Sequence, residues 1–157
     1  MKKAAFLWGI SFLLALGAWA GDPIPLKPTS KDKCPVCGMF VYKYPDWVSQ
    51  AVFRDGSRIY FDGVKDLMKF YFKVPQYQPG KSRGEITVLY VTDYYSLESI
   101  EGARAYYVIG GDVFGPMGKE LIPFGKEAEA REFLKDHKGK RILRFQEIIP
   151  EILKTLD

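Results

Sequence analysis

The sequence predicts an α+β protein made of two small repeated modules, each a strand hairpin followed by a helix. Short β-prone runs alternate with turn residues, and apolar residues recur at helical spacing after two of these runs. The strand-to-helix joints at 59–63 (Ile-Tyr-Phe-Asp-Gly) and 121–125 (Leu-Ile-Pro-Phe-Gly) are alike. The chain has 157 residues, of which 47% are hydrophobic and 15% aromatic, so it can bury a core for this arrangement.

The first module is predicted at 34–80, after a flexible proline-rich tether at 21–33. Within it, strands at 48–53 and 58–61 flank an Asp-Gly pair, which is a strong hairpin signal. Asp62 is placed to cap the following helix. The apolar face of that helix comprises Val64, Leu67, Met68, Tyr71 and Phe72. A proline three residues beyond this face ends the helix.

The second module is predicted at 81–157, after a turn-rich polar stretch. Strands are expected at 86–91 and 105–109, followed by a Gly-Pro-Met-Gly loop and a strand at 121–124. The face of the next helix consists of Ala130, Phe133, Leu134 and His137. A last strand at 141–145 and a short terminal helix that starts at a proline complete the module.

The first twenty residues predict a secretory signal peptide. Lys2 and Lys3 precede an uninterrupted apolar run at 4–20 that ends in Ala-Trp-Ala, so we expect cleavage after Ala20. The run also reaches the lower length limit of a spanning helix, which makes an uncleaved membrane anchor the alternative. No cysteine stands at or near position 21, which argues against a lipid anchor. We therefore expect an exported protein, periplasmic in a bacterium and held in an oxidising compartment.

Charge and motif content exclude two function classes. Cleavage after Ala20 removes two lysines and no acidic residue, so the formal charge falls from +4 to +2 and gives no electrostatic case for a nucleic-acid partner. The only histidine, His137, has no nearby nucleophile motif, and its place in the last turn of a helix is explained by the helix dipole. We expect a protein that is not an enzyme.

Residues 34–39, Cys34-Pro35-Val36-Cys37-Gly38-Met39, form the one dense cluster of reactive side chains. A closed zinc site is disfavoured because the chain has no second Cys-x-x-Cys pair, so carboxylates would have to complete the coordination shell. A thiol–disulfide couple of Cys34 and Cys37 stays open as the alternative function. Its context differs from that of thioredoxin, because the motif follows a proline-rich tether instead of a strand.

The same cluster also fits a soft-metal site. Thiolate and thioether ligands together select Cu(I) over harder ions. Cys37 and Met39 supply two sulfur atoms, and a third donor has to come from elsewhere. Met117 is the best candidate because the glycines of its Gly-Pro-Met-Gly loop permit a close approach. Met68 lies on the apolar helix face and is predicted to be core.

The aromatic strands suggest a further alternative, a module that binds an apolar ligand. Its candidate residues are Tyr94, Tyr95, Tyr106 and Tyr107. Alternation along a strand turns half of such side chains toward the core, which is the simpler explanation.

Four segments follow one another in a specific order: 37–39 (Cys-Gly-Met), 44–47 (Tyr-Pro-Asp-Trp), 61–66 (Phe-Asp-Gly-Val-Lys-Asp) and 115–124 (Gly-Pro-Met-Gly-Lys-Glu-Leu-Ile-Pro-Phe). Together they resemble the NosL family, the accessory proteins of nitrous oxide reductase maturation. The resemblance spans nearly all of the predicted mature chain and implies a periplasmic Cu(I)-binding chaperone with two small αβ modules.

Carried over by position, the resemblance implies Cys37, Met39 and Met117 as copper ligands. Cys34 stands at a position that is less typical of the family, where the resemblance leaves it as either a further copper ligand or a redox partner. The resemblance also implies ligand exchange with nitrous oxide reductase or another cuproenzyme, and an ABC-type maturation complex as docking partner. Two features depart from the family pattern. Many members are lipoproteins, and many have histidine where Lys119 stands, which is a poor copper ligand when protonated.

Overall fold

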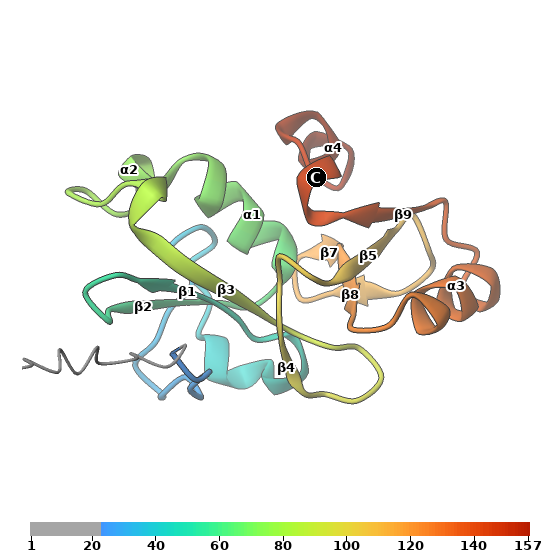
Figure 1. Ribbon diagram of the computed structural model, residues 1–157, viewed down its shortest axis with the longest axis horizontal. Coiled ribbons are helices and arrows are strands. Elements are labelled where there is room, and N and C mark those ends of the chain that lie inside the picture. Colours follow the sequence, from blue (N-terminus) through green and yellow to red (C-terminus); the bar gives the residue numbers. More distant parts are fainter. Residues whose placement is uncertain (1–22) are drawn as a thin grey trace, which may run out of the picture.

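The computed structural model describes residues 23–157. The predicted signal peptide, its cleavage after Ala20 and the alternative membrane anchor lie outside these residues. Between 23 and 157, no helix is long and apolar enough to cross a membrane. Figure 1 shows a larger sheet with a helix across one face, and a second, smaller sheet beside it.

The larger sheet is antiparallel and has the strand order β2-β1-β3-β4. Its strands are β1 (Ser49–Phe53), β2 (Arg58–Phe61), β3 (Ile86–Thr92) and β4 (Ser99–Glu101). The predicted hairpin joins β1 to β2, and Gly56 in its turn has a φ of 81°. Glycine adopts this left-handed conformation without the steric cost that a Cβ would bring.

The helix across this sheet is α1 (Val64–Phe72), and it confirms the predicted helical segment. Val64, Leu67 and Met68 are buried as their spacing predicts, and the predicted core role of Met68 is confirmed. Phe70, which the apolar pattern omits, is also buried and its ring lies 5.1 Å from the ring of Phe61. The short helix α2 (Val74–Tyr77) follows, with a proline in its first turn, where a missing N–H costs nothing.

The smaller sheet has the order β8-β5-β9 and is also antiparallel. Its strands are β5 (Tyr106–Ile109), β8 (Ile122–Phe124) and β9 (Arg141–Arg144), and α3 (Glu127–Asp136) packs on it. A two-stranded hairpin lies between β5 and β8 in the chain, and the short helix α4 contacts α1. The remaining elements are β6 (Phe114–Gly115), β7 (Gly118–Lys119), α4 (Pro150–Thr155), and the 3₁₀ helices η1 (Val41–Lys43), η2 (Pro45–Trp47), η3 (Arg83–Glu85) and η4 (Phe145–Glu147).

The predicted repeat is seen in the order and pairing of the strands and helices of the two modules. In chain order, β1-β2-α1-β3 and β5-β8-α3-β9 both form a hairpin, a helix and a returning strand, and in both the first strand lies at the centre of the three. The α+β class is therefore confirmed, and each module includes a strand after its helix.

The predicted division of the modules at residue 80 does not match the sheets. The strand predicted at 86–91 exists, but as β3 it pairs along the whole of β1 in the first sheet. Hydrophobic alternation predicts that a segment is a strand and carries no information about its partner. The turn-rich stretch before it is the connection that returns the chain from α2 to the central strand β1.

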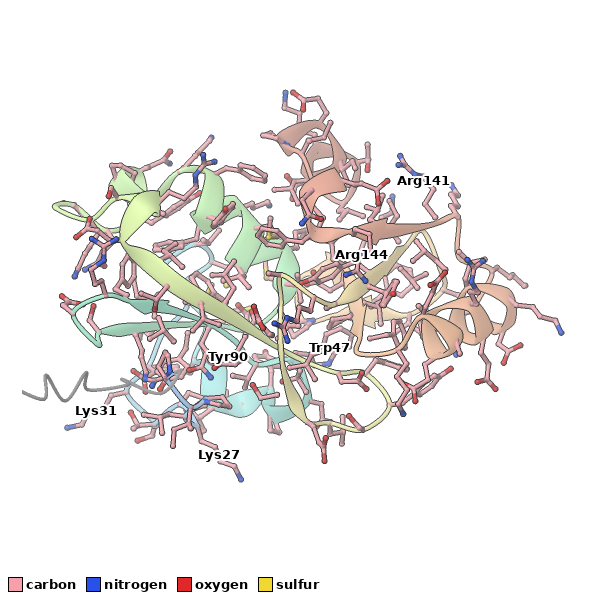
Figure 2. All side chains as sticks on the ribbon, viewed as in Figure 1. Lys27, Lys31, Trp47, Tyr90, Arg141 and Arg144 are labelled. Carbon is pink, nitrogen blue, oxygen red and sulfur yellow. The ribbon has the colours of Figure 1, made fainter. Side chains whose placement is uncertain are left out.

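The second sheet is covered on both faces. Val108 and Phe124 pack against Phe133 of α3, whereas Tyr107 and Leu143 belong to the core that α1 and the first sheet share. Trp47 of η2 packs against the α3 side, and Figure 2 shows it where the two sheets meet. One core cluster therefore includes residues of both modules, and Trp47 of the first module packs against the other cluster, so the two modules are packed together.

Residues 23–33, the part of the predicted flexible tether that the structure describes, are ordered against the first sheet. The Leu26 N–H donates to the Gln50 side chain, whose amide donates back to the Leu26 carbonyl, and the Tyr90 hydroxyl donates to the Pro23 carbonyl. Gln50 and Tyr90 are register partners on β1 and β3. Prolines predict an extended chain correctly, but the polar groups of the sheet hold it in place. Lys27 points away from the protein (Figure 2).

Candidate metal centre

The Cys34–Met39 segment forms a closed loop in front of η1. The Cys34 N–H donates to the Met39 carbonyl at 2.9 Å, and the Gly38 N–H donates to the Cys34 carbonyl at 2.8 Å. Gly38 has a φ of 80°, so the turn needs glycine. An isolated bridge between Lys33 and Phe40 closes the base of the loop. The backbone therefore fixes both thiols relative to each other.

Two aspartates from the start of α1 face these thiols. The Cys34 thiol donates to Asp66 Oδ2 at 3.3 Å, and the Cys37 thiol donates to Asp62 Oδ1 at 3.2 Å. One ligand atom from each of the four residues lies within 4.8 Å of every other. Asp62 is 1% exposed, and its second oxygen, Oδ2, is buried with no hydrogen-bond partner in the described part of the chain.

The prediction that Asp62 caps α1 is wrong. The residue at the N-cap is Gly63, and no side chain of its own caps the helix. Asp62 stands one position earlier, where the end of β2 turns its carboxylate toward Cys37. A short polar side chain just before a helix caps it when no other group competes for its hydrogen bonds. Here the Cys37 thiol competes for the carboxylate of Asp62.

Both cysteines are free, and burial dominates their acid–base behaviour. Burial raises the pKa of the Cys34 thiol far above its ordinary value. It also raises the pKa of the half-buried Cys37 thiol to about 12, and hydrogen bonds to Asp62 and Asp66 add to this shift. Both groups are therefore thiols at neutral pH, and a metal ion has to displace their protons on binding.

The two predicted methionine ligands differ in exposure. Met39 follows the loop glycine and is half-buried, whereas Met117 is 44% exposed at the turn between β6 and β7. The Lys65 ammonium donates to the Met117 carbonyl at 2.8 Å. Lys65 is next in the chain to Asp66, so this bond ties the Met117 turn to the first turn of α1.

A second contact joins the same two segments. The Lys65 N–H, near the uncapped start of α1, donates to Glu120 Oε1, and the Leu121 N–H donates to the same oxygen at 2.9 Å. A Cβ on Gly63 would stand 2.3 Å from Glu120 Oε2, so the approach requires glycine. Burial raises the pKa of the Glu120 carboxyl to about 8. Glu120 thus accepts a backbone N–H near the start of α1 from the segment between β7 and β8.

Sequence reasoning missed four residues of this centre: Asp62 as a thiol partner, Lys65, Asp66 and Glu120. Three of them lie in the Phe-Asp-Gly-Val-Lys-Asp segment and the fourth follows Gly-Pro-Met-Gly-Lys, so the motifs already contained them. Their roles depend on contacts across 25 to 55 residues, which no local pattern specifies.

The remaining candidates lie elsewhere. His137 ends α3, with Nδ1 2.9 Å from Asp112 Oδ1 and its ring stacked on Phe133 at 4.2 Å. Lys119 is exposed on β7. Tyr107 is buried with its hydroxyl bonded to the Gly102 carbonyl, and Tyr94 packs on the rings of Phe124 and Phe133, so both contribute to the core. Tyr95 packs on the same two rings but is 45% exposed.

Comparisons with known proteins agree on one family. The NosL family model matches residues 25–153. The copper-binding lipoprotein NosL of Stutzerimonas stutzeri is 30% identical over 138 residues, which cover 83% of this chain and 68% of that protein. Among solved structures, the copper chaperone NosL from Shewanella denitrificans superposes with a TM-score of 0.69 at 23% identity, covering 82% of this chain and 97% of that one.

The solution structure of apo-NosL from Achromobacter cycloclastes matches less extensively, with a TM-score of 0.48 at 23% identity over 67% of this chain and 87% of that one. The family model covers most of the chain, and the Shewanella denitrificans structure has the same fold. This chain therefore belongs to the NosL family.

Proposed function

We propose that this protein binds Cu(I) through sulfur and passes it to a partner by ligand exchange. One observation carries the proposal: the bond from Lys65 to the Met117 carbonyl brings the turn with an exposed thioether to the helix start whose carboxylates contact both thiols. The relatives named above are a copper-binding protein and a copper chaperone, which supports copper as the ion.

Cys37, Met39 and Met117 are the proposed ligands, with Cys34 as a fourth sulfur beside them. Thiolate and thioether donors favour Cu(I) over harder ions. The ligands are graded in exposure, from the buried Cys34 to the exposed Met117. An ion held at such an edge keeps an open side where an incoming thiolate or imidazole can bind before a protein ligand leaves. Carriage of this kind needs no catalytic residue.

Membership of the NosL family supports a proposal for the destination of the copper. We infer that the recipient is nitrous oxide reductase or another cuproenzyme, with an ABC-type maturation complex as docking partner. Transfer would take place in the periplasm, after export directed by the segment that ends at Ala20. The sulfur set would protect the reduced ion on the way.

The test is a competition titration against a Cu(I)-specific chromophoric chelator under anaerobic conditions. We expect Cys37→Ser to weaken Cu(I) binding by more than about a hundredfold, beyond the 10–100-fold typical of supporting residues, and Met117→Leu to weaken it by about tenfold. Met68→Leu is the matched control, because this thioether is buried in the core and the exchange preserves volume. A wild-type protein that fails to compete, or a Cys37→Ser variant that competes equally well, would overturn the proposal.

A thiol–disulfide function is the second candidate, because the two sulfurs lie within 4.8 Å of each other. The raised pKa values of both cysteines oppose it, since exchange proceeds through a thiolate. Cys34→Ser separates the two functions. If the protein carries copper, this variant should still bind Cu(I) through Cys37. If the protein is a thiol–disulfide enzyme, the variant should lose all reductase activity.

A further inference from the structure

We propose that the face of the larger sheet opposite α1 docks on the surface of an anionic lipid bilayer. Three segments form this docking face: residues 23–33, the 3₁₀ helices η1 and η2, and the β3–β4 loop at 93–98. Figure 1 shows them along the lower side of the molecule, with α1 above the sheet. The inference goes beyond the proposed copper function and does not depend on it.

Alternation along β1 separates the docking face from the α1 side. Ala51 and Phe53 belong to the core that the sheet shares with α1. Gln50 points to the other side, where its side chain bonds to the backbone of Leu26. Cys34 is in the same core cluster as Ala51, so docking leaves the candidate metal centre turned away from the bilayer.

The docking face contains an open groove of about 520 Å³ with apolar walls. Each of the three segments contributes one large apolar side chain to its lining, Leu26, Tyr42 and Leu97, and these side chains are 45–55% exposed. Ile24, two residues before Leu26, is still more exposed. Single exposed apolar residues are ordinary on a protein surface, whereas a group of them around one groove marks an interaction site.

The backbone of Leu97 supplies an independent observation. Its φ of 59° is a left-handed conformation, which a residue with a Cβ adopts at a steric cost and which glycine and asparagine adopt readily. Asp93 holds the turn, because its carbonyl accepts the Leu97 N–H at 3.0 Å and its carboxylate accepts the N–H groups of Tyr95 and Ser96. A position that favours asparagine for stability thus presents a leucine to solvent, which points to a role in binding.

The chain that precedes the docking face indicates a bilayer as the partner. Residues 4–20 are an uninterrupted apolar run, and Ala20 stands three residues before Pro23. The Pro23 carbonyl accepts a hydrogen bond from the Tyr90 hydroxyl on β3, which fixes this point to the sheet. Three residues span about 11 Å at most. While the apolar run is in a membrane during export, the docking face is therefore held next to that membrane.

Lysines accompany the apolar side chains of the docking face. Lys27 lines the groove, and Lys43 follows Tyr42 in η1. Figure 2 shows Lys27 and Lys31 extending away from the protein on this side. Ammonium groups attract anionic headgroups, while apolar side chains enter the boundary between headgroups and acyl chains. Asp46 also lines the groove, so we assign most of the binding to apolar contact and the choice of anionic lipid to the lysines.

The experiment is co-sedimentation of the chain from Gly21 to Asp157 with lipid vesicles. This chain lacks the apolar run and contains all residues of the described fold. We expect it to bind vesicles of phosphatidylglycerol and phosphatidylcholine at least about fivefold more tightly than vesicles of phosphatidylcholine alone. Lys27→Gln and Lys31→Gln should each weaken binding to the mixed vesicles by about fivefold.

Leu97→Asn separates binding from stability. Asparagine suits the left-handed turn, so the thermal unfolding temperature should stay the same or rise, while vesicle binding should weaken by at least about tenfold. Leu26→Asn should also weaken binding, since the bonds of Leu26 to Gln50 involve only its backbone. Ile149→Asn is the matched control: it is 46% exposed and is the N-cap of α4, outside the docking face, where asparagine is favourable. It should bind vesicles like the wild type.

Three results would overturn the proposal. The first is a wild-type chain that binds neither kind of vesicle or binds both equally. The second is equal binding by the wild type, Leu97→Asn and Leu26→Asn. The third is a wild type that self-associates without lipid and a Leu97→Asn variant that does not, which would assign the groove to a second copy of the chain. None of these results affects the copper titration, which is scored through Cys37 and Met117 without vesicles.

Discussion

The starts of α1 and α3 occupy equivalent places in the two modules, yet different groups hold them. Near the start of α1, the Lys65 N–H donates to Glu120, which belongs to the second half of the chain. Just before α3, the Gly125 N–H donates at 2.6 Å to Asp93, which follows β3 in the first half. Each joint is therefore fixed by a buried carboxylate from the other module.

This reciprocal arrangement serves two different ends. Asp93 also accepts the N–H groups of Tyr95 and Ser96, so it organises its own turn as well as the joint. Glu120 instead lies three residues after Met117, beside the thiol–carboxylate cluster. The comparison teaches that the repeated topology supplies the scaffold, and that unlike residues at equivalent joints make one of them a candidate metal centre.

The largest expected effect is on stability, from the carboxylate that holds the α3 joint. Asp93→Ala leaves three N–H groups without their acceptor, so we expect a loss of about 3 kcal/mol in the free energy of unfolding. Urea unfolding measures it, with the exposed Asp112→Ala as control. Variant protein that remains folded should still bind Cu(I). A comparable loss of copper affinity would show that the two joints are not functionally distinct.

A glycine exchange compares the joints directly. A Cβ on Gly63 would lie 2.3 Å from Glu120 Oε2, whereas a Cβ on Gly125 would meet Asp93 Oδ2 at 3.5 Å, an ordinary contact. Glu120 is buried and cannot swing away freely, so we expect Gly63→Ala to cost about 1–3 kcal/mol by overpacking. Gly125→Ala should cost less. Equal losses in urea unfolding would contradict the special role of the first joint.

The contribution of Glu120 can be measured from the pH dependence of the free energy of unfolding. Its pKa in the folded protein is about 8 against an ordinary 4.5, because burial favours the neutral acid. Its contribution is therefore complete below the ordinary pKa and is lost as the pH rises through the folded value. We expect the free energy of unfolding of the wild type to fall relative to that of Glu120→Gln between about pH 5 and pH 8. A constant difference across this range would refute the assignment.

The smallest expected effect concerns the exposed face of α3. Arg131 and Glu127 form an i,i+4 ion pair whose side chains are largely solvated, so we expect Arg131→Ala to cost about 0.3–0.5 kcal/mol. The effect should disappear in thermal unfolding at high salt, because salt screens exposed charges. A loss above about 1 kcal/mol would mean that α3 depends on its surface as much as α1 depends on its buried joint.

The local pattern of apolar and turn residues predicted most helices and strands, but not which strands pair with each other. The spacing of Val64, Leu67 and Met68 fixed α1, and Asp-Gly fixed the first hairpin, because both signals lie within a few residues. The membership of β3 in the first sheet depends on pairing with β1 across more than 30 residues. The same limit hid the placement of residues 23–33, whose hydrogen bonds to the first sheet come from Gln50 and Tyr90.

By itself, the sequence determined the sulfur content of the candidate centre, the glycine turn at Gly38, the two helices with their apolar faces, and the family. Only the tertiary structure decided that Asp62 and Asp66 face the thiols and that Lys65 and Glu120 hold the Met117 hairpin to α1. The physical reason is one of range. Turns and helices arise from neighbouring residues, whereas a buried polar cluster exists only once distant segments have excluded water around it.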